Sequence, residues 1–174
     1  MKYILAFLGI GAICLGIFLF GGQKVETEDY MRIHIVANSN SNFDQNVKYV
    51  VKDAVVEYLI PFLADAETKN EAMQIISREK DNLQAVANAA LKSEGARYGA
   101  TLTVSSENMP TRAYGDLVLE EGVYDVLQIN LGDAKGDNWW CVVFPAVCFV
   151  NSKNSANFEY ISKIWEIIHS VTNK

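Results

Sequence analysis

The 174-residue chain is poor in the side chains that build metal sites and disulfide frameworks, with three cysteines and two histidines. The Cys141–Cys148 spacing matches no zinc-binding pattern, and three cysteines are too few for a disulfide scaffold. If the domain lies outside the cytosol, a Cys141–Cys148 disulfide across a bend at Pro145 is possible, and two reduced, buried thiols are the alternative. We therefore predict that the chain has no metal and no cofactor.

Basic residues are also scarce, because 15 lysines and arginines stand against 21 aspartates and glutamates, for a net charge of −6. An acidic balance argues against nucleic acid as a partner and against tight binding to anionic lipid headgroups. It does not identify a partner.

Recognisable catalytic motifs are missing as well: there is no nucleophile elbow, phosphate-binding loop or HExxH sequence. Cys141 lies in an apolar run, which would raise the pKa of its thiol and make it inert, so a Cys141–His34 nucleophilic pair is only an alternative. Asp133 and Asp137 could hold calcium, but glycine-aspartate loops are usually ordinary turns. We predict that the chain is not an enzyme and has no small-molecule substrate.

A long apolar segment opens the chain, since residues 3–22 carry no charged side chain. At about 1.5 Å per helical residue, this segment would reach about 30 Å, the thickness of the hydrocarbon core of a bilayer. It lacks a pair of small residues for cleavage, so residues 1–22 are predicted to be a leader helix, either a signal peptide or an N-terminal membrane anchor. The segment 23–29 would be a linker to an exported domain.

The rest of the chain predicts an α+β domain over residues 30–150, followed by a linker and an amphipathic tail helix in residues 151–174. A half-buried strand at 30–37, with Arg32 and His34 on its polar face, precedes helices at 44–64 and from Thr68 to Gly95. The second helix could break near Lys80. Strands are expected at 101–104, 117–119, 123–131 and 139–150. This order favours a largely antiparallel sheet with two or three helices packed on one face.

Two runs carry a resemblance to a known family. The run from Arg32 to Ser41 reads RIHIVANSNS, and the run from Asn138 to Pro145 reads NWWCVVFP. With matching spacing over about residues 32–150, the chain resembles stage II sporulation protein R. The leader is similar in kind, and the tail helix lies outside the similarity.

The resemblance implies a signalling protein. Members of that family are made in the forespore of endospore-forming bacteria and are exported to the space between the forespore and mother-cell membranes. There they act on a membrane-bound, aspartic-type protease of the mother cell, which removes the pro-sequence of a mother-cell sigma factor. The resemblance provides no catalytic residues. It leaves open whether the ligand is secreted or stays anchored by its leader.

A partner-binding surface is predicted where the cluster at residues 38–42 meets the loop at 132–139, because polar loop residues there flank rigid strands. Trp139 and Trp140 would face opposite sides of a strand. The competing interpretation is that Asn38 and Ser39 only cap the first helix. An exported hydrolase using Cys141 or His34 and a cell-wall binding module remain alternative functions. The candidate contact residues are Asn38, Ser39, Asn40, Asp137, Asn138, Trp139 and Trp140.

Overall fold

The computed structural model describes residues 27–115 and 117–145. The predicted leader, most of the predicted linker, the tail helix and Cys148 therefore lie outside the described residues. Within those residues, no helix is both long enough and apolar enough to cross a bilayer. A short 3-10 helix, η1 (Thr27–Asp29), leads into the domain.

Two long helices follow the first strand, and both begin at side-chain caps. Helix α2 (Asn42–Leu63) is capped by Ser41, whose hydroxyl accepts a hydrogen bond from the backbone N–H of Asp44. The run Thr68-Lys69-Asn70-Glu71 predicts a capping box, with Thr68 as the cap and Glu71 as its reciprocal partner. Thr68 does cap helix α3 (Lys69–Ser93), but the Glu71 carboxylate accepts from the N–H of Glu67 rather than from that of Thr68. The α3 helix is continuous, so the predicted alternative of a break near Lys80 is wrong.

Among the described residues, the main sheet has four strands in the order β2-β5-β1-β6. Strands β2 and β5 pair antiparallel, as do β1 and β6, whereas β1 and β5 pair parallel. The sheet is therefore mixed, and the prediction missed the parallel pair. The chain reverses its direction at each step from β1 to α2, from α2 to α3, from α3 to β2 and from β2 to β5. Because the number of reversals is even, β5 runs in the same direction as β1. The strands are β1 (Met31–Val36), β2 (Ala100–Met109), β5 (Gly122–Leu131) and β6 (Asn138–Phe144).

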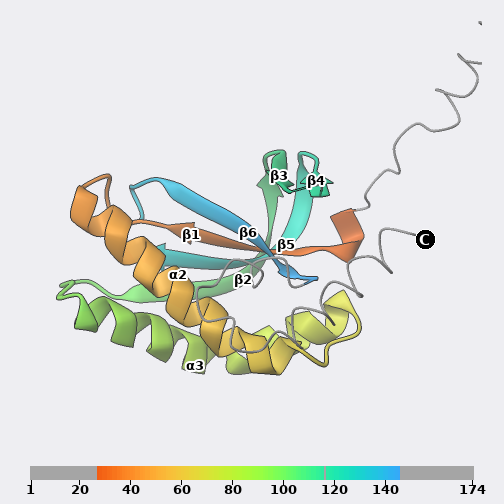
Figure 1. Ribbon diagram of the computed structural model, residues 1–174, viewed down its shortest axis with the longest axis horizontal. Coiled ribbons are helices and arrows are strands. Elements are labelled where there is room, and N and C mark those ends of the chain that lie inside the picture. Colours follow the sequence, from red (N-terminus) through yellow and green to blue (C-terminus); the bar gives the residue numbers. More distant parts are fainter. Residues whose placement is uncertain (1–26, 116, 146–174) are drawn as a thin grey trace, which may run out of the picture.

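Both helices cover one face of this sheet, and a small hairpin of β3 (Arg112–Tyr114) and β4 (Leu117–Leu119) stands over the other (Figure 1). The helix side holds the larger apolar core, in which β1 contributes Met31, Ile33 and Ile35. The helix placement agrees with the predicted one-face packing.

The hairpin side holds a smaller apolar cluster, and this cluster buries Arg32 completely. The prediction that Arg32 lies on the polar face of a half-buried strand is therefore wrong, because the face is apolar and covered at this position. Alternation in β1 places Arg32 opposite the helices, but it cannot show that a hairpin from 80 residues later in the chain covers that end of the face. The smaller cluster consists of Tyr30, Met109, Leu119, Tyr124, Val126 and Val142.

Candidate functional site

The two segments predicted to form a contact surface lie together at one end of the sheet. The loop Gly132–Asp137, here called the crossing loop, carries the chain from β5 to β6 over the end of β1. The N–H of Gly136 donates to the carbonyl of Ala37 at 2.9 Å, and the N–H of Lys135 donates to that of Asn38 at 3.1 Å. The crossing loop is therefore fixed to the residues that follow β1.

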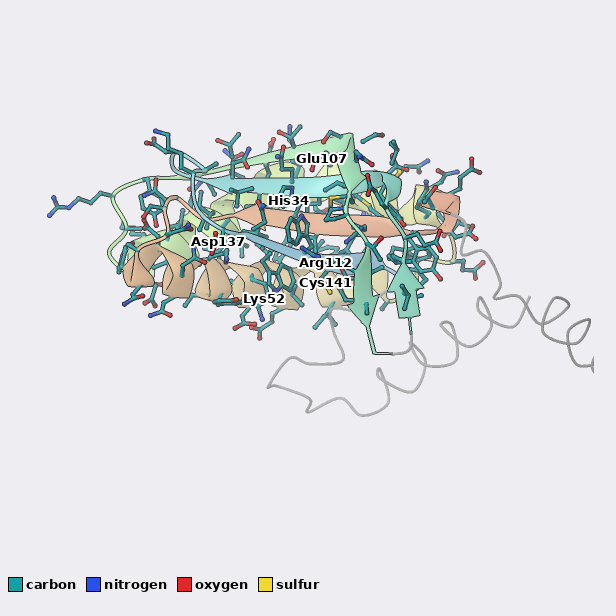
Figure 2. The ribbon with its side chains drawn as sticks, turned by 90° about the horizontal axis from the view of Figure 1, so that it is seen from above. His34, Lys52, Glu107, Arg112, Asp137 and Cys141 are labelled. Atoms are coloured by element: carbon teal, nitrogen blue, oxygen red, sulfur yellow. The ribbon has the colours of Figure 1, made fainter. Side chains whose placement is uncertain are left out.

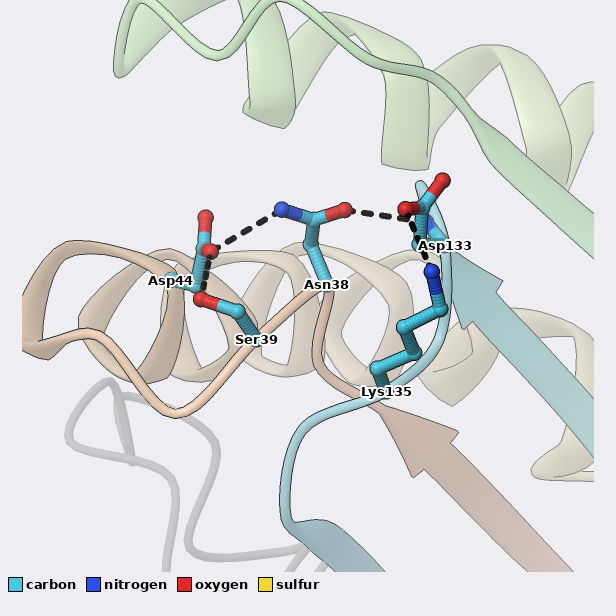
Figure 3. A network of polar contacts seen from close by, with 5 residues as sticks. All are labelled: Asn38, Ser39, Asp44, Asp133 and Lys135. Atoms are coloured by element: carbon cyan, nitrogen blue, oxygen red, sulfur yellow. Dashed lines mark hydrogen bonds and ion pairs between the residues drawn. The ribbon is translucent and has the colours of Figure 1, made fainter.

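Asn38 and Ser39 use their side chains inside the domain (Figure 3). The Asn38 amide donates to Asp44 at 3.0 Å, while its oxygen accepts from the N–H of Asp133 at 2.9 Å. The Ser39 hydroxyl donates to the same carboxylate oxygen of Asp44 at 2.5 Å. Asn38 and Ser39 are therefore neither the helix cap nor free polar groups, because Ser41 is the cap and these two side chains bind a buried carboxylate.

Asp44 is the centre of this network, although it is only 5% exposed. The Tyr98 hydroxyl donates to its other oxygen at 2.5 Å. Burial by itself raises the pKa of Asp44, but the hydrogen bonds from Ser39, Tyr98 and Asn38 outweigh that effect and lower the pKa to about 2. The carboxylate is thus ionised at neutral pH, and it joins the start of α2 to the end of β1.

A second set of contacts holds the other end of the crossing loop. The N–H of Asp137 donates to the side-chain oxygen of Asn40 at 2.6 Å. Lys48, a buried residue of α2, donates to the carbonyl of Asp137 at 2.9 Å and to Gln45 at 2.7 Å. Burial lowers the pKa of Lys48. Of the predicted contact residues, Asn40, Asp137 and Asn138 are exposed.

The crossing loop depends on two glycines that lie against the chain after β1. A Cβ at Gly132, where φ is 57°, would lie 2.3 Å from the side-chain oxygen of Asn38. A Cβ at Gly136 would lie 2.3 Å from the backbone oxygen of Ser39 and 2.9 Å from the Cβ of Ala37. A side chain at Gly136 would therefore require the backbone of the two segments to move apart, whereas one at Gly132 would displace the side chains of Asn38 and Tyr98.

Gly136→Ala is expected to lower the free energy of unfolding by about 2 kcal/mol, since backbone at residue 39 must move to admit a methyl group. Chemical denaturation monitored by circular dichroism measures the change. Ala134→Gly is the matched control in the same loop, because Ala134 has a φ of 51° that glycine adopts without strain. A Gly136→Ala protein as stable as the parent would show that the loop does not need this close approach.

The face opposite the helices carries a second group of side chains, near the hairpin (Figure 2). The His34 ring stacks on Trp140 with 5.6 Å between ring centroids. Its Nδ1 lies 2.9 Å from a carboxylate oxygen of Glu107, and its Nε2 lies 2.8 Å from the side-chain oxygen of Asn138. The Arg112 guanidinium lies 4.3 Å from the Trp140 ring centroid. Four separate strands thus contribute to one cluster.

The two tryptophans face opposite sides of β6, as predicted. Trp140 pairs with His34, whereas Trp139 pairs with Ile35 and packs against the helix-side core, with the Lys52 amine 5.8 Å from its ring centroid. Sequence reasoning found Trp140 and Asn138 but missed Glu107 and Arg112. No local motif marks those two residues, because their role depends on how β2 and β3 are placed.

Cys141 and His34 lie on opposite faces of the sheet, so the nucleophilic pair considered above does not form. Cys141 is opposite Ile33 in the β1–β6 register and belongs to the helix-side core, whereas His34 is opposite Trp140. Cys141 takes part in a disulfide whose other cysteine lies outside the described residues. The specific pairing with Cys148 stays a prediction.

Comparison with known proteins supports the resemblance found in the sequence. The family described as stage II sporulation protein R matches residues 27–154. The chain is 34% identical to stage II sporulation protein R of Bacillus subtilis (strain 168) over 160 residues, which cover 82% of this chain and 71% of that protein. No solved structure matches. The chain therefore belongs to the stage II sporulation protein R family.

Proposed function

We propose that the protein is an exported sporulation signal that activates a membrane-bound, aspartic-type protease of the mother cell. The observation that carries this proposal is the family match across residues 27–154, which includes all of the described residues. Activation would start proteolytic processing of the sigma-factor precursor during endospore formation. The signal would act from the space between the two membranes, as a secreted protein or as one anchored by its leader.

The arrangement of the domain supports a binding role. It also removes one form of the hydrolase alternative, the Cys141–His34 pair, because the two side chains lie on opposite faces of the sheet. The predicted contact region has a fixed backbone, because the crossing loop is hydrogen-bonded to the chain after β1. A partner that recognises a preformed surface avoids the entropic cost of ordering it. Such a ligand shifts the protease toward its active state by binding that state more tightly.

Reconstitution in a non-sporulating bacterium tests the proposal. The host would express the cognate protease and the sigma-factor precursor, together with either the full chain or a version that starts at Gln23 and stays in the cytoplasm. We expect shortening of the precursor on an immunoblot with the full chain only. Absence of processing with a folded, exported protein would contradict the proposal, and equal processing with both versions would contradict the extracytoplasmic site of action.

A further inference from the structure

The hairpin side of the sheet concentrates guanidinium groups in an otherwise acidic chain. Arg32 of β1 lies beneath the hairpin, and Arg112 of β3 lies on the hairpin itself. Among the described residues, neither arginine forms an ion pair with a carboxylate. Since acidic residues outnumber basic ones by 21 to 15, two unpaired arginines so close together are a distinct feature of the molecule.

Arg32 is buried, with 0% of its surface exposed, and its contacts all involve uncharged groups. Its guanidinium donates to the carbonyl of Pro110 at 3.2 Å and to the hydroxyl of Tyr114 at 3.1 Å, and it lies 4.9 Å from the ring centroid of Tyr124. Its Nε has no hydrogen-bond partner within the described part of the chain. Arg32 therefore supports the hairpin from below and leaves positive charge there without a counter-ion.

Arg112 presents the same charge to solvent. It is exposed, and its guanidinium carbon lies 4.3 Å from the ring centroid of Trp140. One Nη1–H of Arg112 donates to the carbonyl of Thr111 at 3.3 Å. The other N–H donors form no hydrogen bond among the described residues, and a guanidinium held against an aromatic ring keeps such donors available at the edge of the stack. The carboxylate of this cluster, Glu107, forms an ion pair with His34, and the exposed Glu120 and Glu121 at the hairpin base form no ion pair with Arg112.

We propose that Arg112 and Trp140, here called the arginine–tryptophan surface, bind an acidic segment of the protein partner. An aspartate or glutamate of that segment would accept two parallel N–H bonds from the Arg112 guanidinium, while neighbouring apolar atoms contact Trp140. Arg32 acts as a positioning residue, because it holds the hairpin that carries Arg112. This inference rests on the proposed function, and it adds the chemistry of the partner: a carboxylate-bearing segment that complements the Arg112 guanidinium, which has no ion pair among the described residues.

Charge reversal at Arg112 tests this surface in the reconstituted processing assay with the full chain. Arg112→Glu is expected to reduce the initial rate of precursor shortening by about tenfold or more, because it opposes like charges. Arg112→Lys keeps the charge and is expected to retain part of the rate. Arg97→Glu is the matched control, since Arg97 is also exposed, forms no ion pair among the described residues and lies between α3 and β2. Circular dichroism would show that all three proteins fold.

The outcomes separate this inference from the proposed function. If the wild-type chain gives no processing, the proposed function fails. If the wild type works and folded Arg112→Glu works equally well, only the arginine–tryptophan surface fails. An equal loss of processing rate in Arg112→Glu and Arg97→Glu would mean that added negative charge lowers the rate wherever it lies on the domain. That result would contradict a specific role for the arginine–tryptophan surface. The Arg112→Glu protein could also process the precursor normally but no longer co-sediment with purified peptidoglycan. That result would assign the surface to cell-wall binding and would overturn the proposal.

Discussion

Asp44→Asn is expected to lower the free energy of unfolding by about 2–3 kcal/mol at pH 7, as is typical when hydrogen bonds to a charged group are lost. The substitution keeps the shape of the side chain but removes the negative charge that Ser39, Tyr98 and Asn38 bind. An asparagine also brings two donors to a place where three donors already converge. Urea denaturation at several pH values measures the change.

The pH dependence gives this prediction a second readout. Because the pKa of Asp44 is lowered in the fold, from 3.8 to about 2, its contribution to stability is complete above about pH 4 and is lost as the pH falls toward 2. The asparagine variant lacks this titration. The difference in stability between the two proteins should therefore be largest at neutral pH and should shrink steadily below pH 4.

Asp53→Asn is the matched control on the same helix. Its side chain is 64% exposed and forms its one ion pair among the described residues with Lys52, so the loss of its charge should change stability by less than about 0.5 kcal/mol. A difference between wild type and Asp44→Asn that stayed constant from pH 7 to pH 2 would show that Asp44 does not titrate as the network predicts. Equal effects at both positions would show that the network adds nothing to the fold.

The helices could be predicted because their signals are local. Thr68 as a cap and Gly95 as a stop stand next to the helix that they bound, and Gly95 adopts a φ of 79°. The parallel pairing of β1 with β5 could not be predicted in this way. It depends on how many times the chain crosses the domain between the two strands, and no short stretch of sequence records that number.

The candidate site shows the same division. The crossing loop and residues 38–42 were predicted to meet, because both flank strand ends and are rich in turn residues. The hydrogen bonds from Asn38 and Ser39 to the buried Asp44 carboxylate were not predicted. In the sequence, Asp44 is an ordinary acidic residue in the first turn of a helix. Arg112 and Glu107 carry no local signal. They reach Trp140 and His34 only after the sheet has brought four strands together.

Arg32→Ala is expected to lower the free energy of unfolding by about 3 kcal/mol, because it leaves a cavity under the hairpin and removes two hydrogen bonds. The loss should be concentrated where Arg32 acts. The hairpin at residues 112–119 pairs only with itself among the described strands, so its contacts with the sheet depend on the side chains below it. The exchange rate of each backbone amide should therefore be compared between the variant and wild type. The increase should be larger for the hairpin amides than for the amides of α2 and α3.

Arg32→Met separates the volume of the side chain from its charge. Methionine fills most of the same space without a buried cation or an unpaired Nε, so it should recover most of the stability lost in the alanine variant. It cannot donate to Pro110 or Tyr114, and the hairpin should still exchange faster than in wild type. A methionine variant as unstable as the alanine variant would contradict this division, because it would mean that the guanidinium bonds stabilise the whole domain. Full stability with unchanged exchange in Arg32→Ala would show that the hairpin is held without Arg32, and Arg112 would then owe its position to Trp140 alone.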